Sequence, residues 1–390
     1  MIPSITQYYN LNKILLIVIG LWPYQQSTFT RLQSIFFFLI VTAGIIFQLT
    51  PLILLKCSTD LIVKVLSSVV LYILFLVNYY AFRLNIEVVK NLMMDLQRAF
   101  NKLKDKNEIA ILEKYSCIAK RYTIVITAGG ICIIFISIVT QFVSKTIVFV
   151  VSMNVSQPYE FLILMKYFID QEKYFYLIVL HIYAGICFGT VSVVSVGTMI
   201  NTYLQHMCGM FRIASYRIEH AVSINIKQNI TLENKNLMIE GIVCGVDIHR
   251  QAMKLTKQLV SAFEIMLCCL IVAEVLFLVL NLFQIIVNKN TFEELCPHIC
   301  CVFVSLTYLF IFNYVGQDVE DHNNRIFSTA YNVQWYKAPI HVQKMILFLL
   351  QKETMKFNLN IGRLFNTSIE SFAVLVKVSI SYCTALYSTQ

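Results

Sequence analysis

The sequence predicts an all-α membrane protein, a bundle of seven transmembrane helices. Of its 390 residues, 58% are hydrophobic and only 14% are charged, whereas a soluble domain carries about 25% charged residues. The apolar residues are grouped in seven segments, and a helix of roughly 20 residues is enough to cross a bilayer. These segments lie at about 32–55, 62–82, 122–151, 174–200, 261–287, 297–316 and 366–387.

The first 30 residues predict a short amphipathic helix at the membrane surface. Apolar residues recur at helical spacing from Leu11 to Ile19, and Gly20 and then Trp22 and Tyr24 follow. Aromatic side chains favour the interface between membrane and water. A basic stretch and a small-residue cleavage site, which mark a signal peptide, are both missing. We therefore expect the first spanning segment to direct insertion.

The positive charge predicts the orientation in the membrane. With the N-terminus in the cytosol, the stretches 1–31, 83–121, 206–257 and 317–363 hold 24 of the 31 Lys and Arg residues. Lys and Arg collect on the cytoplasmic side of membrane proteins. We expect a cytoplasmic N-terminus and, because the number of spans is odd, an extracellular C-terminus. The net charge of +9 then reflects topology and contact with the lipid bilayer, and we expect no nucleic-acid partner.

The cytoplasmic segments predict helices that extend below the membrane. Residues 84–121 and 201–260 each continue one span, turn at a polar stretch and enter the next span. A half-polar helix is expected at about 340–352. Packed together, these inner helix ends would form a cytoplasmic anchor bundle.

Enzyme and cofactor signatures are missing from the sequence. It contains no HExxH, GxxxxGK[ST] or Rossmann glycine pattern, so we expect no catalytic residues and no cofactor. The cluster of Asp318, Glu320, Asp321 and His322 could ligate a metal, but a solvated helix end explains it better, and we expect no metal site. The 12 cysteines have no spacing that demands a disulfide, although the outer ones could oxidise.

One glycosylation site is expected. The sequon Asn154-Val-Ser156 falls in the second outer loop, where the glycosylation machinery reaches it. The sequons at Asn229 and Asn366 lie on the cytosolic side and at the start of the last span, and we expect neither to be modified.

Aromatic side chains gather in or near the outer halves of the spans. Most aromatics in a helical bundle simply pack, and a histidine there is more often a hydrogen-bonded packing residue. The same residues could instead line an apolar cavity with a few polar groups, which is the form that small-molecule sites take. We expect such a cavity to be lined by Tyr72, Phe75, Tyr79, Phe135, Thr140, Phe175, His181, Phe303 and Tyr308, and Phe142 and Phe277 share this level.

The last span is unusually polar. Glu370 and Lys377 are seven residues apart and so lie on one face of a helix, near Ser381 and Ser388. Ionisable residues within a span face the bundle interior or water rather than lipid. This segment is therefore expected to face other helices or a water-lined surface.

The chain resembles the insect odorant receptor family at both ends and in the order of its motifs. Each motif alone is weak. The matching residues are Tyr8-Tyr9 with Asn12, Gly20-Leu21-Trp22-Pro23, Gly316 with Asp318 and Glu320, Ser328, Ala330-Tyr331-Asn332, Gln334-Trp335-Tyr336, and Phe365, Ser368, Phe372, Ser379 and Ser381-Tyr382.

The resemblance implies an odorant-binding subunit of a ligand-gated, non-selective cation channel. Such receptors assemble with an odorant receptor co-receptor, as tetramers, in the plasma membrane of olfactory sensory neurons, and bind a small volatile or hydrophobic ligand. The divergent sequence favours an odorant-tuned member over the co-receptor. Trp335, Tyr336 and the 340–352 helix would then belong to the subunit anchor.

The resemblance also implies that the last span lines the pore. The positions of the family's hydrophobic gate fall on Ala385 and Thr389, with Tyr382 and Ser388 near the path. Neither gate residue is bulky and apolar, which suggests that co-receptor subunits close the pore. Lys377 would hinder cations in the pore, so we expect it to face neighbouring helices or the wider inner vestibule.

Two other classes of receptor remain as alternatives. A gustatory-type channel would end its last span with a Gln-Phe pattern, and here Ser381-Tyr382 is followed by CTALYSTQ. A seven-helix receptor coupled to G proteins would place its N-terminus outside, against the distribution of Lys and Arg, and would carry a DRY or NPxxY pattern.

Overall fold

The structure is a computed structural model of the 390-residue chain. It describes residues 9–25, 27–54, 58–151, 174–227, 232–287, 292–352, 357, 359–362 and 365–388, without the side chains of 140–151, 175, 224–227, 232–233 and 292–294. Asn154 and Thr389 therefore lie outside the described residues, as do the side chains of Thr140, Phe142 and Phe175.

Seven helices are long and apolar enough to cross a membrane, which confirms the predicted all-α, seven-helix class. They are α2 (Thr28–Leu54), α3 (Thr59–Leu84), α5 (Lys106–Val151), α6 (Phe175–Lys227), α7 (Leu232–Val287), α8 (Phe292–Asn332) and α10 (Ile369–Ser388). Each predicted span falls on one of them.

Four of these helices are much longer than a membrane is thick. The 53 residues of α6 extend over about 80 Å at 1.5 Å per residue, whereas the hydrocarbon core of a bilayer is about 30 Å thick. The apolar segments lie toward one end of α5, α6, α7 and α8, so the remaining turns must project beyond the membrane on one side.

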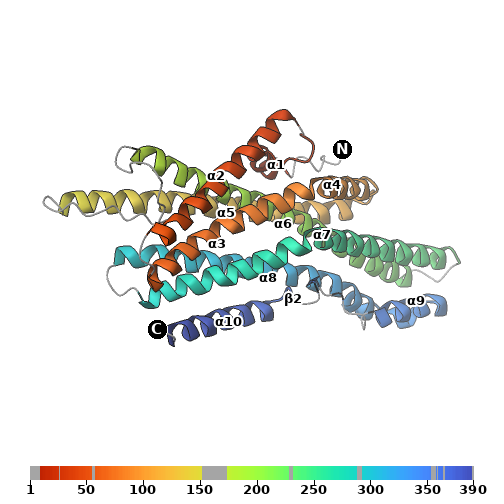
Figure 1. The fold of residues 1–390 in the computed structure, drawn as a ribbon. Helices are drawn as coiled ribbons and strands as arrows, with labels where there is room; N and C mark the ends of the chain where they lie inside the picture. The colour runs from red at the N-terminus through yellow and green to blue at the C-terminus, as the bar shows by residue number, and fades with distance from the viewer. Residues whose placement is uncertain are drawn as a thin grey trace.

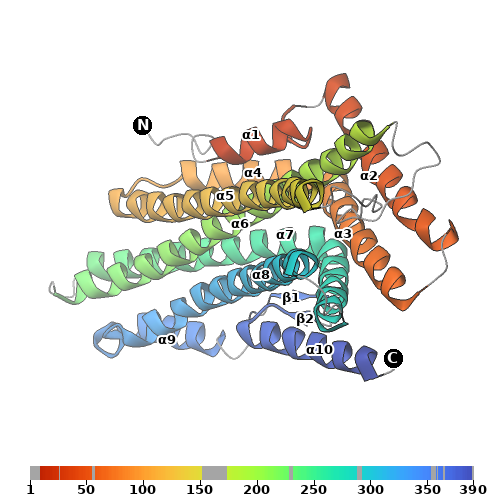
Figure 2. The ribbon, with the colours of Figure 1, turned by 90° about the vertical axis from the view of Figure 1, so that its left-hand side faces the viewer.

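The projecting turns form a second bundle, here called the inner bundle. It contains α4 (Ile86–Asn101), the short 3-10 helix η2 (Trp335–Lys337), α9 (Ile340–Gln351) and the adjoining ends of α5–α8. In Figures 1 and 2 these elements lie at the end of the molecule opposite the C-terminus. Helix α6 is enclosed there by α5, α7 and α8, and every residue from 201 to 211 is buried.

Helix α1 (Asn10–Val18) packs across α5 and α6 instead of crossing the membrane beside them. Asn12 donates a hydrogen bond through Nδ2 to Thr202 Oγ1 over 2.8 Å. The chain turns after the helix at Gly20, whose φ of 71° favours glycine. This helix is the short N-terminal one that the apolar spacing predicts.

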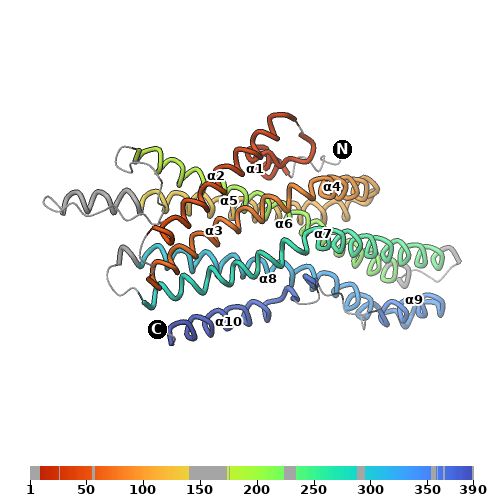
Figure 3. Tube along the Cα trace, in the orientation of Figure 1, coloured from red at the N-terminus to blue at the C-terminus, as the bar shows by residue number. Residues whose placement is uncertain are grey.

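A small hairpin joins α9 to α10 and is the only strand pairing among the described residues. Strand β1 (Asn360–Ile361) pairs antiparallel with β2 (Phe365–Asn366), with Ile361 opposite Phe365. Helix α10 then returns along α7 and α8 at the edge of the bundle, as the tube in Figure 3 shows. No described element covers its other side.

Candidate ligand cavity, pore-lining helix and inner bundle

Tyr72 lies at the centre of the predicted aromatic set. Its buried ring fits between Gly44 on α2 and Gly185 on α6, since a Cβ atom at either glycine would meet that ring. Its hydroxyl donates to the carbonyl oxygen of Ile182 over 3.4 Å. Small residues on two helices therefore create the space that this side chain of a third helix occupies.

Phe75 and Tyr79 continue this contact along α3. A Cβ atom at Gly189 of α6 would collide with the Phe75 ring. The ring of Tyr79 stacks on Phe37 with centroids 4.0 Å apart, and its hydroxyl donates to the Ile19 carbonyl over 3.0 Å. Tyr79 thus reaches toward the end of α1, while Tyr72 and Phe75 lie between α3 and α6.

His181 joins this group from α6. Its Nε2 donates to the Ile40 carbonyl of α2 over 3.1 Å, and its ring meets Phe47 edge-on. His181 therefore acts as a hydrogen-bonded packing residue, and it also places an imidazole among aromatic rings. Tyr72, Phe75 and His181 therefore converge where α2, α3 and α6 meet.

The other described members of the set lie elsewhere. Phe135 on α5 and Phe303 on α8 are 65% and 71% exposed on this single chain. Tyr308 of α8 is half-buried, and Phe277 is buried in α7. The predicted residues thus fall into one converging group and several separate positions.

Buried polar residues that were not predicted lie between the ends of α3, α7 and α8 that point away from the inner bundle. Asn281 of α7 donates to Ser67 Oγ of α3 over 3.0 Å and accepts a hydrogen bond from His298 Nδ1 of α8 over 3.0 Å. Glu274 is buried on α7, two turns away. A polar residue inside an apolar segment is the signal that could have identified them.

Helix α10 contacts the rest of the chain along one narrow stripe. Its fully buried residues are Leu375, Ser379 and Cys383, each four residues from the next. The predicted pore residues lie outside this stripe: Tyr382, which flanks it, is 61% exposed, and Ala385 and Ser388 are exposed as well. Lys377, which was expected to face neighbouring helices or the inner vestibule, is exposed on this single chain.

The inner end of α8 contacts the chain that leads into α10. Thr367, just before α10, packs so closely on Gly316 that a Cβ atom there would collide with its side chain. Thr367 Oγ1 in turn donates to the Leu359 carbonyl over 3.1 Å, which holds the hairpin closed. The lack of a side chain at Gly316 makes room for the Thr367 side chain against α8.

The predicted anchor residues lie on the surface of the inner bundle. Trp335 is half-buried against the core, while Tyr336 is exposed. Next to them, α9 exposes Ile340, Leu347 and Phe348. An apolar helix face of this kind, uncovered in the single chain, is typical of a contact with another protein surface.

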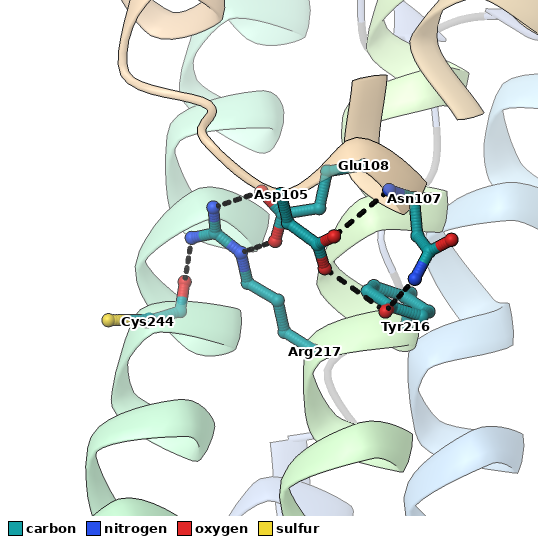
Figure 4. A network of polar contacts seen from close by, with 6 residues as sticks. All are labelled: Asp105, Asn107, Glu108, Tyr216, Arg217 and Cys244. Carbon is teal, nitrogen blue, oxygen red and sulfur yellow. Dashed lines mark hydrogen bonds and ion pairs between the residues drawn. The ribbon is translucent and has the colours of Figure 1, made fainter. Parts of the chain in front are cut away.

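A polar network fastens the α4–α5 turn to α6 and α7, as Figure 4 shows. Arg217 binds both carboxylate oxygens of Glu108, over 2.6 and 2.9 Å, and also donates to the Cys244 carbonyl. Tyr216 donates to Asp105 Oδ2 over 3.0 Å and accepts a hydrogen bond from Asn107. A bidentate pair of this kind fixes geometry as well as charge.

A cavity of about 850 Å³ lies between α4 and α7. Its lining includes Arg250, Lys254 and Lys257 from α7 and Asp95 from α4. It is therefore a polar groove of the inner bundle, separate from the group around Tyr72.

Comparison with known proteins connects this architecture to receptors of insects. The curated relatives that it resembles include odorant receptor 22c of Drosophila melanogaster, 21% identical over 46% of this chain and 45% of the relative, and odorant receptor 13a of the same species, 24% identical over 53% and 51%. The chain therefore matches about half the length of these relatives.

Solved structures resemble the chain over nearly its whole length. The olfactory receptor OR5 of Machilis hrabei in complex with eugenol has a TM-score of 0.72 at 14% identity, and the alignment covers 99% of both chains. A second OR5 structure has a TM-score of 0.69 at the same identity and coverage. At this identity the likeness establishes the fold, a multi-pass bundle. Residues 58–380 match the family described as 7tm odorant receptor, so this chain belongs to the 7tm odorant receptor family.

Proposed function

We propose that the chain is an odorant-binding subunit of a ligand-gated, non-selective cation channel, and has no enzymatic role. Membership of the odorant receptor family supports this function. The observation that carries the proposal is the attachment of α10 by a single stripe. A helix with exposed hydroxyls, an exposed lysine and exposed aromatics is suited to bordering a shared, water-filled path.

The exposed surfaces of the single chain indicate where partner subunits would bind. Assembly with an odorant receptor co-receptor, as a heterotetramer, would cover Trp335, Tyr336 and the apolar face of α9. It would also place Tyr382, Ala385, Ser388 and Thr389 of this chain beside the last helices of the other subunits, around one axis. The corresponding location is the plasma membrane of olfactory sensory neurons, with the N-terminus in the cytosol and the C-terminus outside.

The ligand is a small volatile or hydrophobic molecule. The related OR5 structure carries eugenol, and for this chain the meeting point of α2, α3 and α6 offers aromatic surface and one imidazole. A ligand that fits one packing of these helices better than another shifts the population toward it. The change in helix packing is transmitted to α10 through α7 and α8. The gate opens when water passes a hydrophobic constriction.

Currents from cells that express the chain with and without the co-receptor, over a panel of odorants, test the proposal. We expect odorant-evoked cation currents only in the co-expressing cells. Phe75→Leu and His181→Phe should change the order of preferred odorants at unchanged surface expression. Unaltered tuning in both variants would contradict the placement of the ligand site, and silence across the panel would contradict the function.

A tag after Gln390 tests the orientation separately. We expect antibodies to reach the tag on intact cells and Asn154 to carry a glycan. A tag that is accessible only after permeabilisation would overturn the orientation and, with it, the proposed pore.

A further inference from the structure

Three potential metal ligands meet where α6 and α8 cross in the inner bundle. They are Cys208 from α6 and Asp318 and His322, one helical turn apart on α8, and their ligand atoms all lie within 4.8 Å of one another. Asp318 and His322 lie beyond the apolar segment 297–316. From the sequence they belong to a solvated helix end, and Asp321 is indeed exposed, but Asp318 and His322 are half-buried.

We infer that Cys208, Asp318 and His322 form a binding site for a divalent transition metal of the Zn²⁺ class. A thiolate, an imidazole and a carboxylate are the donors that Zn²⁺ accepts, whereas Mg²⁺ and Ca²⁺ prefer sites made of oxygen atoms alone. Three protein ligands leave the fourth tetrahedral position for water. Binding releases the thiol proton of Cys208 to solvent, and the metal charge then faces one thiolate and one carboxylate.

The surrounding contacts suit such a site. His322 Nδ1 donates to the Asp318 carbonyl over 2.7 Å and lies 3.2 Å from Asp318 Oδ1. A ring held through Nδ1 leaves Nε2 as the nitrogen that can bind the metal, and the Asp318 carboxylate must then turn from Nδ1 toward the metal. Gln205 donates to Asp318 Oδ2 over 3.0 Å and orients the carboxylate. The Tyr115 hydroxyl, 2.7 Å from His322 Nε2, must turn away when the metal binds.

These contacts also have a simpler reading, in which Tyr115, His322, Asp318 and Gln205 form only a hydrogen-bonded chain between α5, α6 and α8. The hydrogen-bonded chain does not require Cys208, which is fully buried and donates no described hydrogen bond to these residues. A metal site requires the thiol. Cys208 therefore separates the two readings, and access is open because the side chains of His322 and Asp318 are 16% and 22% exposed.

The site has a consequence that rests on the proposed function. Asp318 lies two residues from Gly316, where α8 contacts Thr367 ahead of α10. A metal that joins α6 to α8 would restrain α8 at this point, so we expect intracellular Zn²⁺ to reduce odorant-evoked currents.

Cobalt provides a test that needs no channel activity. The purified full chain is titrated with Co²⁺ under reducing conditions, and the affinity for Zn²⁺ is measured by competition with a chromophoric chelator. We expect thiolate-to-cobalt charge-transfer absorption, and a loss of that absorption in Cys208→Ser. Zinc affinity should fall at least about tenfold in Cys208→Ser, Asp318→Asn and His322→Gln, because loss of even a residue that only orients a ligand costs about 10–100-fold.

Cys187→Ser is the matched control, since Cys187 is a half-buried thiol on the same helix. It should keep both the absorption and the affinity. Equal metal binding by the wild type and Cys208→Ser would overturn the site, as would an equal loss in Cys187→Ser. Size-exclusion profiles confirm that the variants are folded, and His322→Gln keeps the test valid if Cys208→Ser misfolds. Because the readout is binding, its failure leaves the channel function untouched.

Discussion

The inner bundle and the membrane-spanning part of the molecule, here called the outer half, are built differently. In the inner bundle α6 is enclosed by α5, α7 and α8, with residues 201–211 all buried, and a partly buried bidentate ion pair fixes the α4–α5 turn. In the outer half, aromatic rings of α3 fit against glycines of α6, and polar side chains bond across helices. A bidentate charge pair fixes geometry as well as charge, whereas apolar ring contacts are not directional. The inner bundle is therefore suited to holding the assembly and the outer half to responding to a ligand.

The largest effect is expected from breaking the inner ion pair. Arg217→Ala leaves the Glu108 carboxylate, whose side chain is only 7% exposed, without its partner. Removing one member of a fully buried pair destabilises by about 3–5 kcal/mol, and because Arg217 is 24% exposed we expect a loss at the lower end of this range. The purified chain should have a lower Tm, and little receptor should reach the cell surface. The control is Arg98→Ala, which breaks an exposed pair with Asp95 worth about 0–1 kcal/mol. An equal decrease in Tm in Arg217→Ala and Arg98→Ala would contradict the larger contribution expected from the Arg217–Glu108 pair.

A smaller effect is expected at the glycines of the outer half. Gly189→Ala places a methyl group against the Phe75 ring, and such overpacking costs about 1–3 kcal/mol. We expect a reduced Tm and a shifted odorant dose–response curve, because Phe75 must move. Gly197→Ala on the same helix is the control, since its Cβ atom meets nothing within 4 Å. An unchanged response in Gly189→Ala would show that this contact does not take part in tuning.

The smallest effect is expected from the polar contact in the outer half. Ser67→Ala removes the single hydrogen bond from Asn281 Nδ2, and a net hydrogen bond contributes about 0.5–1.5 kcal/mol. Thermal unfolding measures the loss, with Thr307→Ala as the control, because the exposed Thr307 hydroxyl bonds only within its own helix. A destabilisation as large as that of Arg217→Ala would mean that the outer half also depends on polar contacts for its stability.

Much of the fold can be predicted from the apolar segments of the sequence, but less of the candidate site can. Long apolar runs with helical extensions predict the spans and the inner helices, because length and hydropathy decide membrane crossing. The same patterns give the depth of a residue in the membrane but not the direction in which it faces. Phe75 and Phe135 therefore look alike in sequence, although one is buried and the other exposed.

Contacts between distant segments could not be predicted at all. Cys208 meets Asp318 only because α6 and α8 cross at that point, and nothing local in either segment encodes the meeting. The hairpin before α10 has two residues in each strand, too few for a periodic pattern. Asn281 and Glu274, by contrast, are polar residues in an apolar segment, and this pattern alone could have predicted that they face the bundle interior.

The hydroxyl groups on the outward face of α10 bear on how a subunit exists in the bilayer before it assembles. Ser381, Thr384 and Ser388 each donate to a carbonyl of their own helix, over 3.0, 2.8 and 2.8 Å. Side chains that bond back in this way leave no donor unmet in hydrocarbon, and the same groups remain free to exchange with water. A single subunit can therefore reside in the bilayer before it assembles. The same face of α10 can then line a water-filled pore without refolding.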